Sequence, residues 1–200
     1  MAPIDAPPTA DTRTRILDVA ERLVQTRGFN GFSYADVAAE LGIAKPSLHY
    51  HFATKADLGE ALIRRYAARF AAALVSIADR PDDARNKLDA YVALYTDVLR
   101  DQRMCLCGML AAEYPTLPAP MRAAVTAFFD DNETWLEQVL DAGRAQGALR
   151  LTGPSDEAAR IIVGGLEGAM LVARSHGDPV RFETAAGRLL ADVTGAASLA

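Results

Sequence analysis

The chain has 200 residues, 50% of them hydrophobic, and a formal net charge of −5 at pH 7. This length suits one large domain, or a small domain fused to a larger one, with ample apolar surface for a core. The negative charge excludes a protein that binds nucleic acid through overall basic charge. Because Ala, Leu, Arg and Glu recur while β-branched runs are scarce, the composition favours an all-α protein.

The charge is distributed unevenly along the chain. Residues 1–55 hold six basic and six acidic side chains, so residues 56–200 carry the whole net charge. A neutral N-terminal part joined to an acidic body suits a DNA-binding module that makes a few placed contacts.

The two cysteines, Cys105 and Cys107, are separated by one residue, which is awkward for a disulfide and offers no zinc tetrad. Free thiols indicate a reducing cytoplasm. No apolar run approaches the roughly 18 residues of a membrane span. We therefore expect no metal, no cofactor and no membrane partner. Residues 1–10 are expected to form a disordered tail rather than a signal peptide.

Apolar residues at helical spacing predict a first helix over residues 12–27. Ser33 begins the second helix as its N-cap, with Asp36 in a capping-box-like position, and Gly42 ends it. A tight turn then leads to a short third helix over residues 45–52.

Six further helices are predicted and no credible strand, which gives an all-α fold of about nine helices. They are expected over residues 54–78, 81–100, 104–114, 119–146, 154–176 and from the turn at 177–179 to residue 194.

The segment from residue 32 to residue 55 contains a helix, a glycine turn and a helix. Two short helices joined by a turn of three or four residues are the DNA-reading unit of helix-turn-helix proteins. The outward side chains of the third helix can donate hydrogen bonds to phosphates and base edges. Ser33 and Lys55 lie at helix starts, where free N–H groups attract phosphate. The alternative is an ordinary helical hairpin with a solvated face.

The sequence SYADVAAELGIAKPSLHYHFATK resembles the tetracycline-repressor-like (TetR/AcrR) family of bacterial regulators. The specific marks of this resemblance are Gly28-Phe29, Asp36-Val37-Ala38, Leu41-Gly42-Ile43, and Leu48 through Phe52 followed by Lys55 and Leu58.

The resemblance implies that the third helix enters the major groove of DNA. The side chains that it implies as DNA contacts are Ser33, Tyr34, Lys45, Ser47, His49, Tyr50, His51 and Lys55. The family usually shows Tyr where this chain has His49, whose reach is shorter. Affinity then needs two copies on a palindromic site, so a homodimer is expected.

The resemblance also divides the chain into residues 11–55, which bind DNA, and residues 56–200, which bind an effector and dimerise. The last two helices of the family usually form the dimer. The residues expected at that face are Ile162, Gly165, Leu166, Ala169, Leu189, Leu190 and Val193. The alternative is that these helices only complete the core of one chain.

The middle helices are expected to enclose a small-molecule effector. The candidate lining residues are Tyr66, Phe70, Tyr91, Tyr95, Met104, Cys107, Leu110, Phe128, Trp135, Met170 and Arg174. Such a stripe of aromatic and Met residues also suits a simple core. A ligand that prefers the non-binding spacing of the domains would lower the affinity for DNA.

Cys105 and Cys107 follow Arg100 and Arg103 and open a short helix, a setting that tends to lower a thiol pKa. The stretch CLCGMLAAEYPTLP resembles a TetR subgroup in which some members sense electrophiles or oxidants. Both cysteines are therefore redox candidates, and the alternative is two inert buried thiols.

No G-x-S-x-G, H-E-x-x-H or phosphate-loop motif is present, so an enzyme is not expected. The prediction is a ligand-responsive repressor that a small molecule releases from a palindromic operator. Two alternatives stay open. One is an electrophile- or redox-sensing repressor acting through Cys105 and Cys107, and the other is a helical ligand-binding protein that does not bind DNA.

Overall fold

The computed structural model describes residues 11–195, which form nine α-helices, one short 3-10 helix and no strand. The elements are α1 (Thr12–Arg27), α2 (Tyr34–Leu41), α3 (Lys45–His51), α4 (Lys55–Ala78), α5 (Ala84–Arg100), α6 (Leu106–Ala112), η1 (Tyr114–Thr116), α7 (Ala119–Ala145), α8 (Ser155–His176) and α9 (Pro179–Thr194). The all-α prediction is confirmed. The predicted tail, residues 1–10, lies outside the described residues. No helix in the described part of the chain is both long and apolar enough to cross a membrane.

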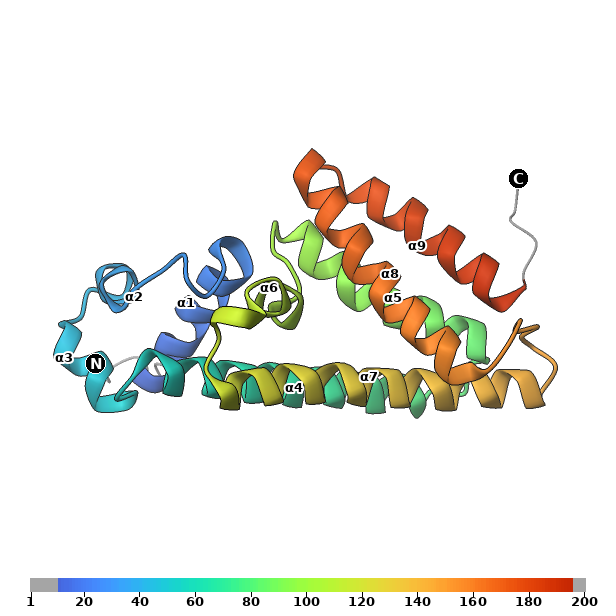
Figure 1. Cartoon of the computed structure of the whole chain (residues 1–200), viewed down its shortest axis with the longest axis horizontal. Coiled ribbons are helices and arrows are strands. Elements are labelled where there is room, and N and C mark those ends of the chain that lie inside the picture. Colours follow the sequence, from blue (N-terminus) through green and yellow to red (C-terminus); the bar gives the residue numbers. More distant parts are fainter. Residues whose placement is uncertain (1–10, 196–200) are drawn as a thin grey trace, which may run out of the picture.

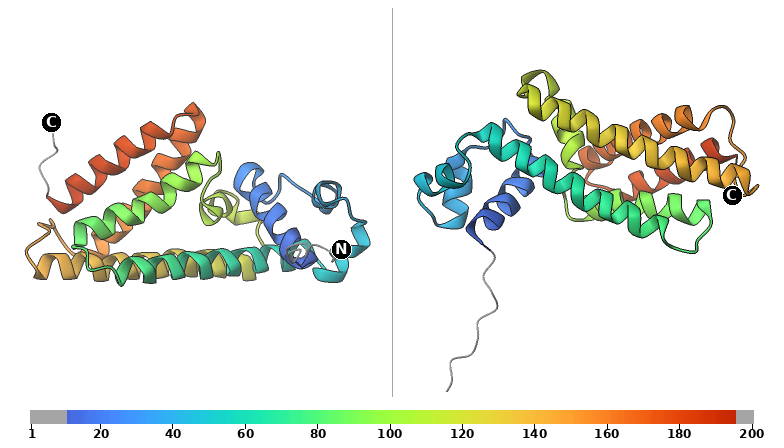
Figure 2. Two further views of the ribbon diagram at one scale, coloured as in Figure 1. Left: turned by 180° about the vertical axis from the view of Figure 1, so that it is seen from behind. Right: turned by 90° about the horizontal axis from the view of Figure 1, so that it is seen from below.

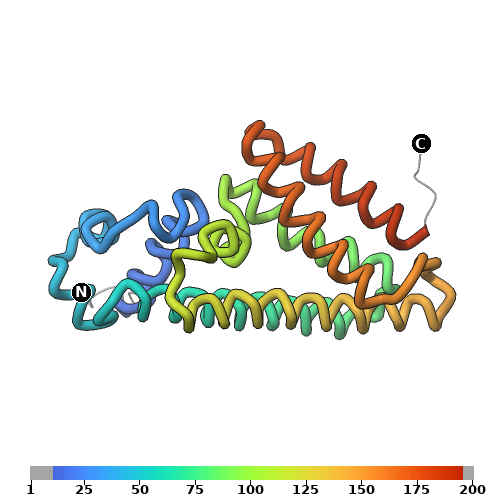
Figure 3. The backbone as a smooth tube through the Cα atoms, in the orientation of Figure 1, coloured from blue at the N-terminus to red at the C-terminus, as the bar shows by residue number. Residues whose placement is uncertain are grey.

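The helices form two groups that meet in the middle of an elongated molecule (Figure 1). The first three helices lie at one end, while α5, α8 and α9 lie together at the other (Figure 3). The long helices α4 and α7 pack against each other and run along the base of the molecule in Figure 1. The short α6 lies between the two groups (Figure 2) and packs against α1, α4 and α7. α6 is therefore placed where the two ends of the molecule meet.

The ends of the helix-turn-helix are fixed by local signals that the sequence contains. Gly42 ends α2 with a φ of 65°, a left-handed conformation that glycine adopts at little cost. At the start of α4, the Thr54 hydroxyl accepts the Asp57 N–H at 3.1 Å. The Asp57 carboxylate in turn accepts the Thr54 N–H at 2.8 Å, which completes a capping box. Both boundaries of the short α3 are thus set by its neighbours.

Two helices begin later than the apolar pattern predicts, because side chains cap them. The Asp83 carboxylate accepts the N–H of Asn86 at 2.9 Å, and α5 follows it. The Cys105 sulfur accepts the N–H of Gly108 at 3.4 Å, so α6 is shorter than the predicted 104–114. Each cap is an interaction between two particular side-chain and backbone atoms, which hydrophobic periodicity does not detect.

Buried apolar side chains hold the short N-terminal helices in place. Leu48 of α3 is fully buried, and the rings of Phe29, Phe32 and Phe52 are buried in the same core. Burying a side chain of this size contributes about 1.5–3 kcal/mol. Helices of seven or eight residues are too short to be stable alone, so this packing stabilises α2 and α3.

Candidate nucleic-acid interface and effector site

The third helix presents polar side chains on an exposed face. Leu48 is fully buried, whereas Lys45, His49 and Tyr50 are exposed. Tyr50 exposes 86% of its surface. A tyrosine in this position offers an apolar ring and a hydroxyl to a partner. The anchored helix thus presents a cation, an imidazole and a phenol together.

A surface hollow of about 360 Å³ lies beside this face. Residues from the starts of three helices line it: Phe32, Ser33, Tyr34, Ala35, Lys45, His49 and Lys55. Five of the eight predicted DNA contacts therefore share one surface. The hollow includes the N-terminal turn of α2, where free backbone N–H groups favour a phosphate.

Tyr34 braces the helix-turn-helix from inside this hollow. Its hydroxyl donates to the carbonyl oxygens of Phe52 at 2.9 Å and Thr54 at 2.6 Å. Burial, with the charge of Asp57 as the smaller cause, raises the pKa of Tyr34 to about 12. The hydroxyl predicted to contact DNA is therefore already used to tie α2 to the turn between α3 and α4.

Lys55, predicted to contact phosphate, also bonds within the chain. Its ammonium donates to the carbonyl oxygens of Phe29 and Phe32 and lies 4.6 and 4.4 Å from their ring centroids. Burial lowers the pKa of Lys55, while the charges of Glu113 and Asp36 oppose that effect. Two carbonyls and two ring faces satisfy the ammonium group internally, so Lys55 stabilises the loop between α1 and α2.

The other predicted DNA contacts differ in how many of their hydrogen-bonding groups are already used within the chain. The Ser33 hydroxyl donates to Asp36 at 2.6 Å and belongs to the capping box at the start of α2. Nδ1 of His49 lies 3.1 Å from a carbonyl oxygen of the following loop. Since Nδ1 then carries a hydrogen, Nε2 donates to phosphate only when the ring is protonated. Ser47 and His51 are half-buried on α3.

Backbone hydrogen bonds at both ends of α6 join it to the DNA-facing helices. Before α6, the Gln25 side chain donates to the Met104 carbonyl at 3.0 Å, and the Met104 N–H donates to the Gln25 carbonyl at 3.1 Å. After α6, the Glu113 carboxylate accepts the N–H groups of Phe29 at 2.6 Å and Asn30 at 3.2 Å. A displacement of α6 would therefore reach the end of α1 and the loop to α2.

Arg174, predicted to line an effector site, belongs to this junction instead. Its guanidinium donates to the Thr26 carbonyl and to the Met109 sulfur at 3.3 Å. The long side chain reaches from α8 across α6 to α1, a span that the sequence gives no means of predicting.

A cluster of charged side chains around the buried Glu21 joins α1 to α4. Glu21 is buried between the guanidinium groups of Arg65, at 2.8 Å, and Arg69. Arg65 also pairs with Asp18 at 2.7 Å. The sequence analysis missed this cluster because charged residues at helical spacing look like a solvated face. It makes α4, which also packs on α7, a second connection between the two ends of the molecule.

Most residues predicted to line an effector site pack tightly in the core. Those that are buried are Tyr66, Tyr91, Tyr95, Met104, Cys107, Leu110, Phe128 and Met170. Six rings form what we call the aromatic cluster: Tyr66, Phe70, Tyr91, Tyr95, Phe128 and Trp135. Neighbouring ring centroids are 5.2 to 6.2 Å apart, as in edge-to-face and stacked aromatic pairs.

The aromatic cluster contains polar groups that bond to one another. The Tyr91 hydroxyl lies 3.0 Å from the Tyr95 hydroxyl and donates to the Asn132 side-chain oxygen at 3.1 Å. The Asn132 amide donates to the Phe128 carbonyl at 2.6 Å. Burial is the main cause that raises the pKa of Tyr91 and Tyr95 far above the usual value, so both hydroxyls stay protonated.

Glu167 of α8 is a functional candidate that the sequence analysis missed. Both of its carboxylate oxygens are buried and, apart from the Cys105 thiol, have no hydrogen-bond partner within residues 11–195. The carboxylate packs so closely on Gly108 of α6 that a Cβ there would collide with it. Burial raises the pKa of Glu167 to about 7, and the polar thiol of Cys105 offsets only part of that effect. The available signal was one acidic residue within the apolar run 161–172.

The structure contradicts the expectation of low-pKa thiols at Cys105 and Cys107. Both are buried, and burial, followed by the charge of Glu167, raises their pKa well above the usual value. Arg100, which was expected to favour the thiolates, pairs instead with Glu183 at 2.9 Å. The thiolates are disfavoured because they are desolvated and lie near a carboxyl group.

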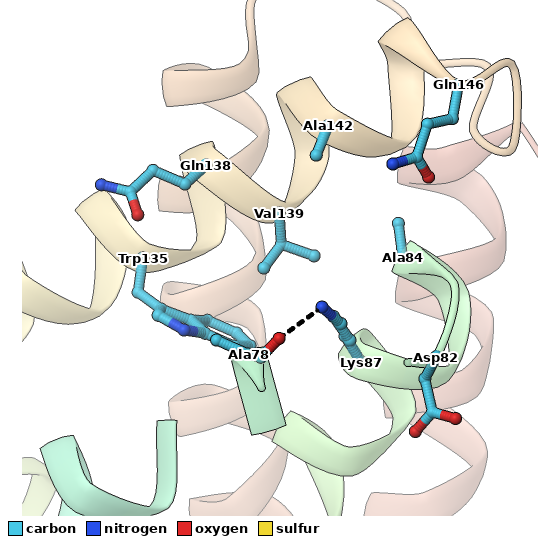
Figure 4. A pocket seen from close by; sticks show the side chains of 9 residues that line it. All are labelled: Ala78, Asp82, Ala84, Lys87, Trp135, Gln138, Val139, Ala142 and Gln146. Atoms are coloured by element: carbon cyan, nitrogen blue, oxygen red, sulfur yellow. Dashed lines mark hydrogen bonds between the residues drawn. The ribbon is translucent and has the colours of Figure 1, made fainter. Parts of the chain in front are cut away.

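A pocket of about 220 Å³ opens at the far end of the molecule, between α4, α5 and α7 (Figure 4). It is lined by Ala78, Asp82, Ala84, Lys87, Trp135, Gln138, Val139, Ala142 and Gln146. The Lys87 ammonium donates to the Ala78 carbonyl at 2.7 Å. Trp135, the single tryptophan of the sequence, stacks on Tyr91 with ring centroids 5.5 Å apart. Trp135 therefore connects the open pocket with the aromatic cluster.

Several residues predicted at a dimer face are buried inside one chain. Ile162, Leu166 and Leu190 are buried, and Gly165 lies against Leu189 of α9. The prediction is wrong for the buried Ile162, Leu166 and Leu190, because their side chains fill the space between α8 and its neighbours. Ala169 and Val193 are half-buried against the same core.

The exposed surface of α8 and α9 carries a different apolar set. Ile161, Leu171, Val172 and Val180 expose between 48% and 62% of their surface. On α8, Gly164 and Gly168 leave open space where a side chain would stand. These residues form a surface, here called the outer α8–α9 face, that offers apolar contacts and room for close helix approach.

Comparison with protein families matches both parts of the chain. Residues 16–62 match the family described as bacterial regulatory proteins, tetR family. Residues 84–189 match the description tetracyclin repressor-like, C-terminal domain.

Three similar proteins agree with these matches. A TetR-family transcriptional regulator from Agrobacterium tumefaciens has a TM-score of 0.87 and 35% identity, over 91% of this chain and 97% of that one. The HTH-type transcriptional repressor NemR of Escherichia coli is 26% identical, over 82% of this chain and 84% of NemR. The structure of its reduced form has a TM-score of 0.76, over 90% and 95% of the two chains.

The third is a regulator from Saccharomonospora viridis in complex with choline. It has a TM-score of 0.77 and 25% identity, over 91% of this chain and 96% of that one. All three similar proteins are regulators of transcription and not enzymes.

Proposed function

The chain belongs to the TetR family of bacterial regulatory proteins, and on that premise we propose that it is a repressor which leaves a palindromic operator when a small molecule binds its C-terminal domain. Like its relatives it is a ligand-responsive, DNA-binding regulator of transcription. No catalytic role is proposed. Its site of action is the cytoplasm, where its operator DNA is found.

One observation carries this proposal: the exposed face of α3, anchored by Leu48, adjoins the hollow at the start of α2. A short anchored helix with exposed polar residues suits the major groove. We assign Lys45 to a phosphate and Tyr50 to a sugar or base edge. Tyr34 and Lys55 instead position the helices that make these contacts.

DNA binding requires two copies of this face. One module has a neutral sequence and few contacts, so it gains affinity by binding two half-sites about 34–36 Å apart or a similar spacing. We assign the outer α8–α9 face to the dimer, because its large apolar side chains are exposed in a single chain. A two-fold pair of such faces would cover them.

The effector response depends on α6. A ligand in the C-terminal domain that displaces α6 would pull on the bonds from Met104 to Gln25 and from Glu113 to Phe29. The distance between the two α3 helices of the dimer would then no longer match the distance between the two operator half-sites. A ligand shifts this equilibrium only by its difference in affinity for the two states.

Operator selection from random DNA with the purified protein tests the proposal. We expect enrichment of one palindromic sequence. Lys45→Ala should weaken binding and reduce the salt dependence of log K by about two for a dimer, one phosphate contact from each copy. Arg85→Ala, which removes an exposed charge from α5, is the matched control. Enrichment of no sequence would favour the alternative, a helical ligand-binding protein that does not bind DNA.

The junction has its own test. Glu113→Ala removes the acceptor of two backbone N–H groups and lies away from α3, so we expect a several-fold change in operator affinity through domain spacing alone. Glu157→Ala, on the exposed side of α8, should leave affinity unchanged. Equal affinities of the two variants would contradict the proposed coupling.

A second candidate function is electrophile sensing through Cys105. Its sulfur caps α6, and the structure of the relative NemR is described as a reduced form. Addition of this thiol to a quinone forms a carbon–sulfur bond, moves the thiol proton to the adduct and would displace α6. The buried, high-pKa thiols oppose this function. If benzoquinone releases operator DNA from the native protein but not from Cys105→Ser, this candidate replaces the first.

A further inference from the structure

Glu167 places a carboxyl group in the core of the C-terminal domain, where neither DNA binding nor dimerisation needs one. Apart from the Cys105 thiol, neither oxygen has a hydrogen-bond partner within the described residues. The other buried acidic side chain there, Glu21, is paired with Arg65 and Arg69. A buried carboxyl group without a charged partner is costly, so the contrast indicates a site for a positive charge that residues 11–195 do not supply.

The side chains around Glu167 are neutral at pH 7 and supply no positive charge. The titratable groups whose pKa its charge raises are Tyr66 on α4, Tyr91 and Tyr95 on α5, and Cys105 and Cys107 at the start of α6. All of these groups are uncharged when protonated. A bound anion would be repelled by the Glu167 carboxylate. A bound cation would be attracted to it and would supply the positive charge that the site lacks.

The aromatic cluster supplies the second half of a cation site. Faces of tyrosine and tryptophan rings attract ammonium groups within about 6 Å. Tyr66, Tyr91 and Tyr95 are both members of this cluster and neighbours of Glu167. The carboxyl group and the rings therefore belong to one buried region of the C-terminal domain.

We propose that Glu167 and the aromatic cluster form the effector site, and that the effector is a protonated amine with an apolar body. The ammonium group donates hydrogen bonds to the Glu167 oxygens, and the apolar body lies among the rings. This inference rests on the proposed function, since it names the chemical class of the effector.

The open pocket provides an approach to the site. Trp135 lines that pocket (Figure 4) and stacks on Tyr91. The ring centroids of Tyr91 and Tyr95 are in turn 5.4 Å apart. A ligand that enters beside Trp135 and separates it from Tyr91 reaches the rings around Glu167. Binding should therefore change the fluorescence of Trp135, the single tryptophan of the chain.

The position of Glu167 also links the ligand to α6. Its carboxylate packs on Gly108, inside the short helix whose two ends hold α1 and the following loop. A carboxylate that turns toward an ammonium group moves away from Gly108. Binding of the amine to Glu167 would thus change the contact with Gly108 and shift α6, which is bonded to α1 and to the loop that follows α1.

The test compares two probes of nearly equal shape, phenethylamine and 2-phenylethanol, by calorimetry and Trp135 fluorescence. Phenethylamine is a cation at pH 8, and 2-phenylethanol is neutral. We expect the native protein to bind the amine at least tenfold more tightly, and Glu167→Gln to remove that preference while binding of the alcohol changes less than twofold. Glu157→Gln on the same helix is the control. Equal binding of the two probes, or no binding of the amine at millimolar concentration, would overturn the proposal.

A second measurement needs no variant. Since the pKa of Glu167 is about 7, the ionised fraction rises about tenfold between pH 6 and pH 8, and affinity for phenethylamine should rise with it. The three histidines lie elsewhere: His49 and His51 are on α3, and His176 is exposed at the end of α8. A flat pH profile for the amine would also overturn the proposal. Operator binding is measured without either probe, so the proposed repressor function can hold even if this inference fails.

Discussion

The DNA-facing end and the core of the C-terminal domain keep their polar groups in opposite surroundings. On α3, Lys45 and Tyr50 are exposed above a buried Leu48. In the C-terminal domain, Tyr91, Asn132 and the carboxylate oxygens of Glu167 are buried. An exposed polar group costs little stability and is free for a partner, whereas a buried one alters the free energy of unfolding. Substitutions of exposed polar residues at the DNA-facing end should therefore change operator binding without changing stability. Substitutions of buried polar residues in the C-terminal core should change both ligand binding and stability.

The largest expected effect is the pH dependence that Glu167 confers. Its pKa rises from a usual 4.5 to about 7 on folding. Between these values the folded state holds a proton that the unfolded state has lost, so stability falls as pH rises through this window and stays low above it. At about 1.4 kcal/mol per pH unit, the loss is about 3 kcal/mol.

Urea unfolding of the native protein and Glu167→Gln at fixed protein concentration, from pH 4.5 to 7.5, measures this loss. The stability of the variant relative to the native protein should rise by about 3 kcal/mol across the series. A difference that does not change with pH would show that Glu167 is not buried as the structure has it.

The next effect tests the hydroxyl network in the same core. Tyr91→Phe removes the donor to the Asn132 side-chain oxygen and the partner of the Tyr95 hydroxyl, so unfolding should require about 1–2 kcal/mol less. Tyr114→Phe is the matched control, because Tyr114 is exposed and its hydroxyl lies 3.4 Å from Thr126. Equal urea midpoints for the two variants would show that the buried Tyr91 hydroxyl contributes no more to stability than the exposed Tyr114 hydroxyl.

A smaller effect is expected at the helix cap of the DNA-facing end. Thr54→Ala deletes the hydroxyl that accepts the Asp57 N–H, which should cost about 1 kcal/mol. Thr134→Ala, an exposed mid-helix position on α7, should cost nothing. Thermal unfolding followed by circular dichroism compares the two, and a stable Thr54→Ala protein would mean that the turn before α4 does not depend on its cap.

The smallest expected change in stability is at Tyr50. Because 86% of its surface is exposed, Tyr50→Ala should alter the unfolding free energy by less than about 0.5 kcal/mol. Operator affinity, measured by gel shift at fixed salt with the selected sequence, should nevertheless fall at least tenfold. A variant that binds the operator like the native protein would show that the exposed face of α3 does not contact DNA.

The sequence by itself determined the helices and the DNA-reading unit. Apolar spacing, the glycine after α2 and the polar caps are local signals, and residues close in the chain decide them. The outward positions Lys45, His49 and Tyr50 followed from the period of a helix whose one fully buried residue is Leu48. Such positions can be read from sequence because a short helix has only one side to bury.

The tertiary structure decided which polar groups are enclosed and by what. Nothing local shows that Lys55 turns to the carbonyls of Phe29 and Phe32, or that Arg174 reaches α1. The inner and outer faces of α8 are similar in composition, since both carry aliphatic side chains and glycines, so its period alone did not say which face meets the core. Glu167 is recognisable as a site only when α4, α5 and α6 close around it. Burial and charge pairing depend on residues far apart in the chain, and the long-range packing that brings them together is what the sequence pattern does not contain.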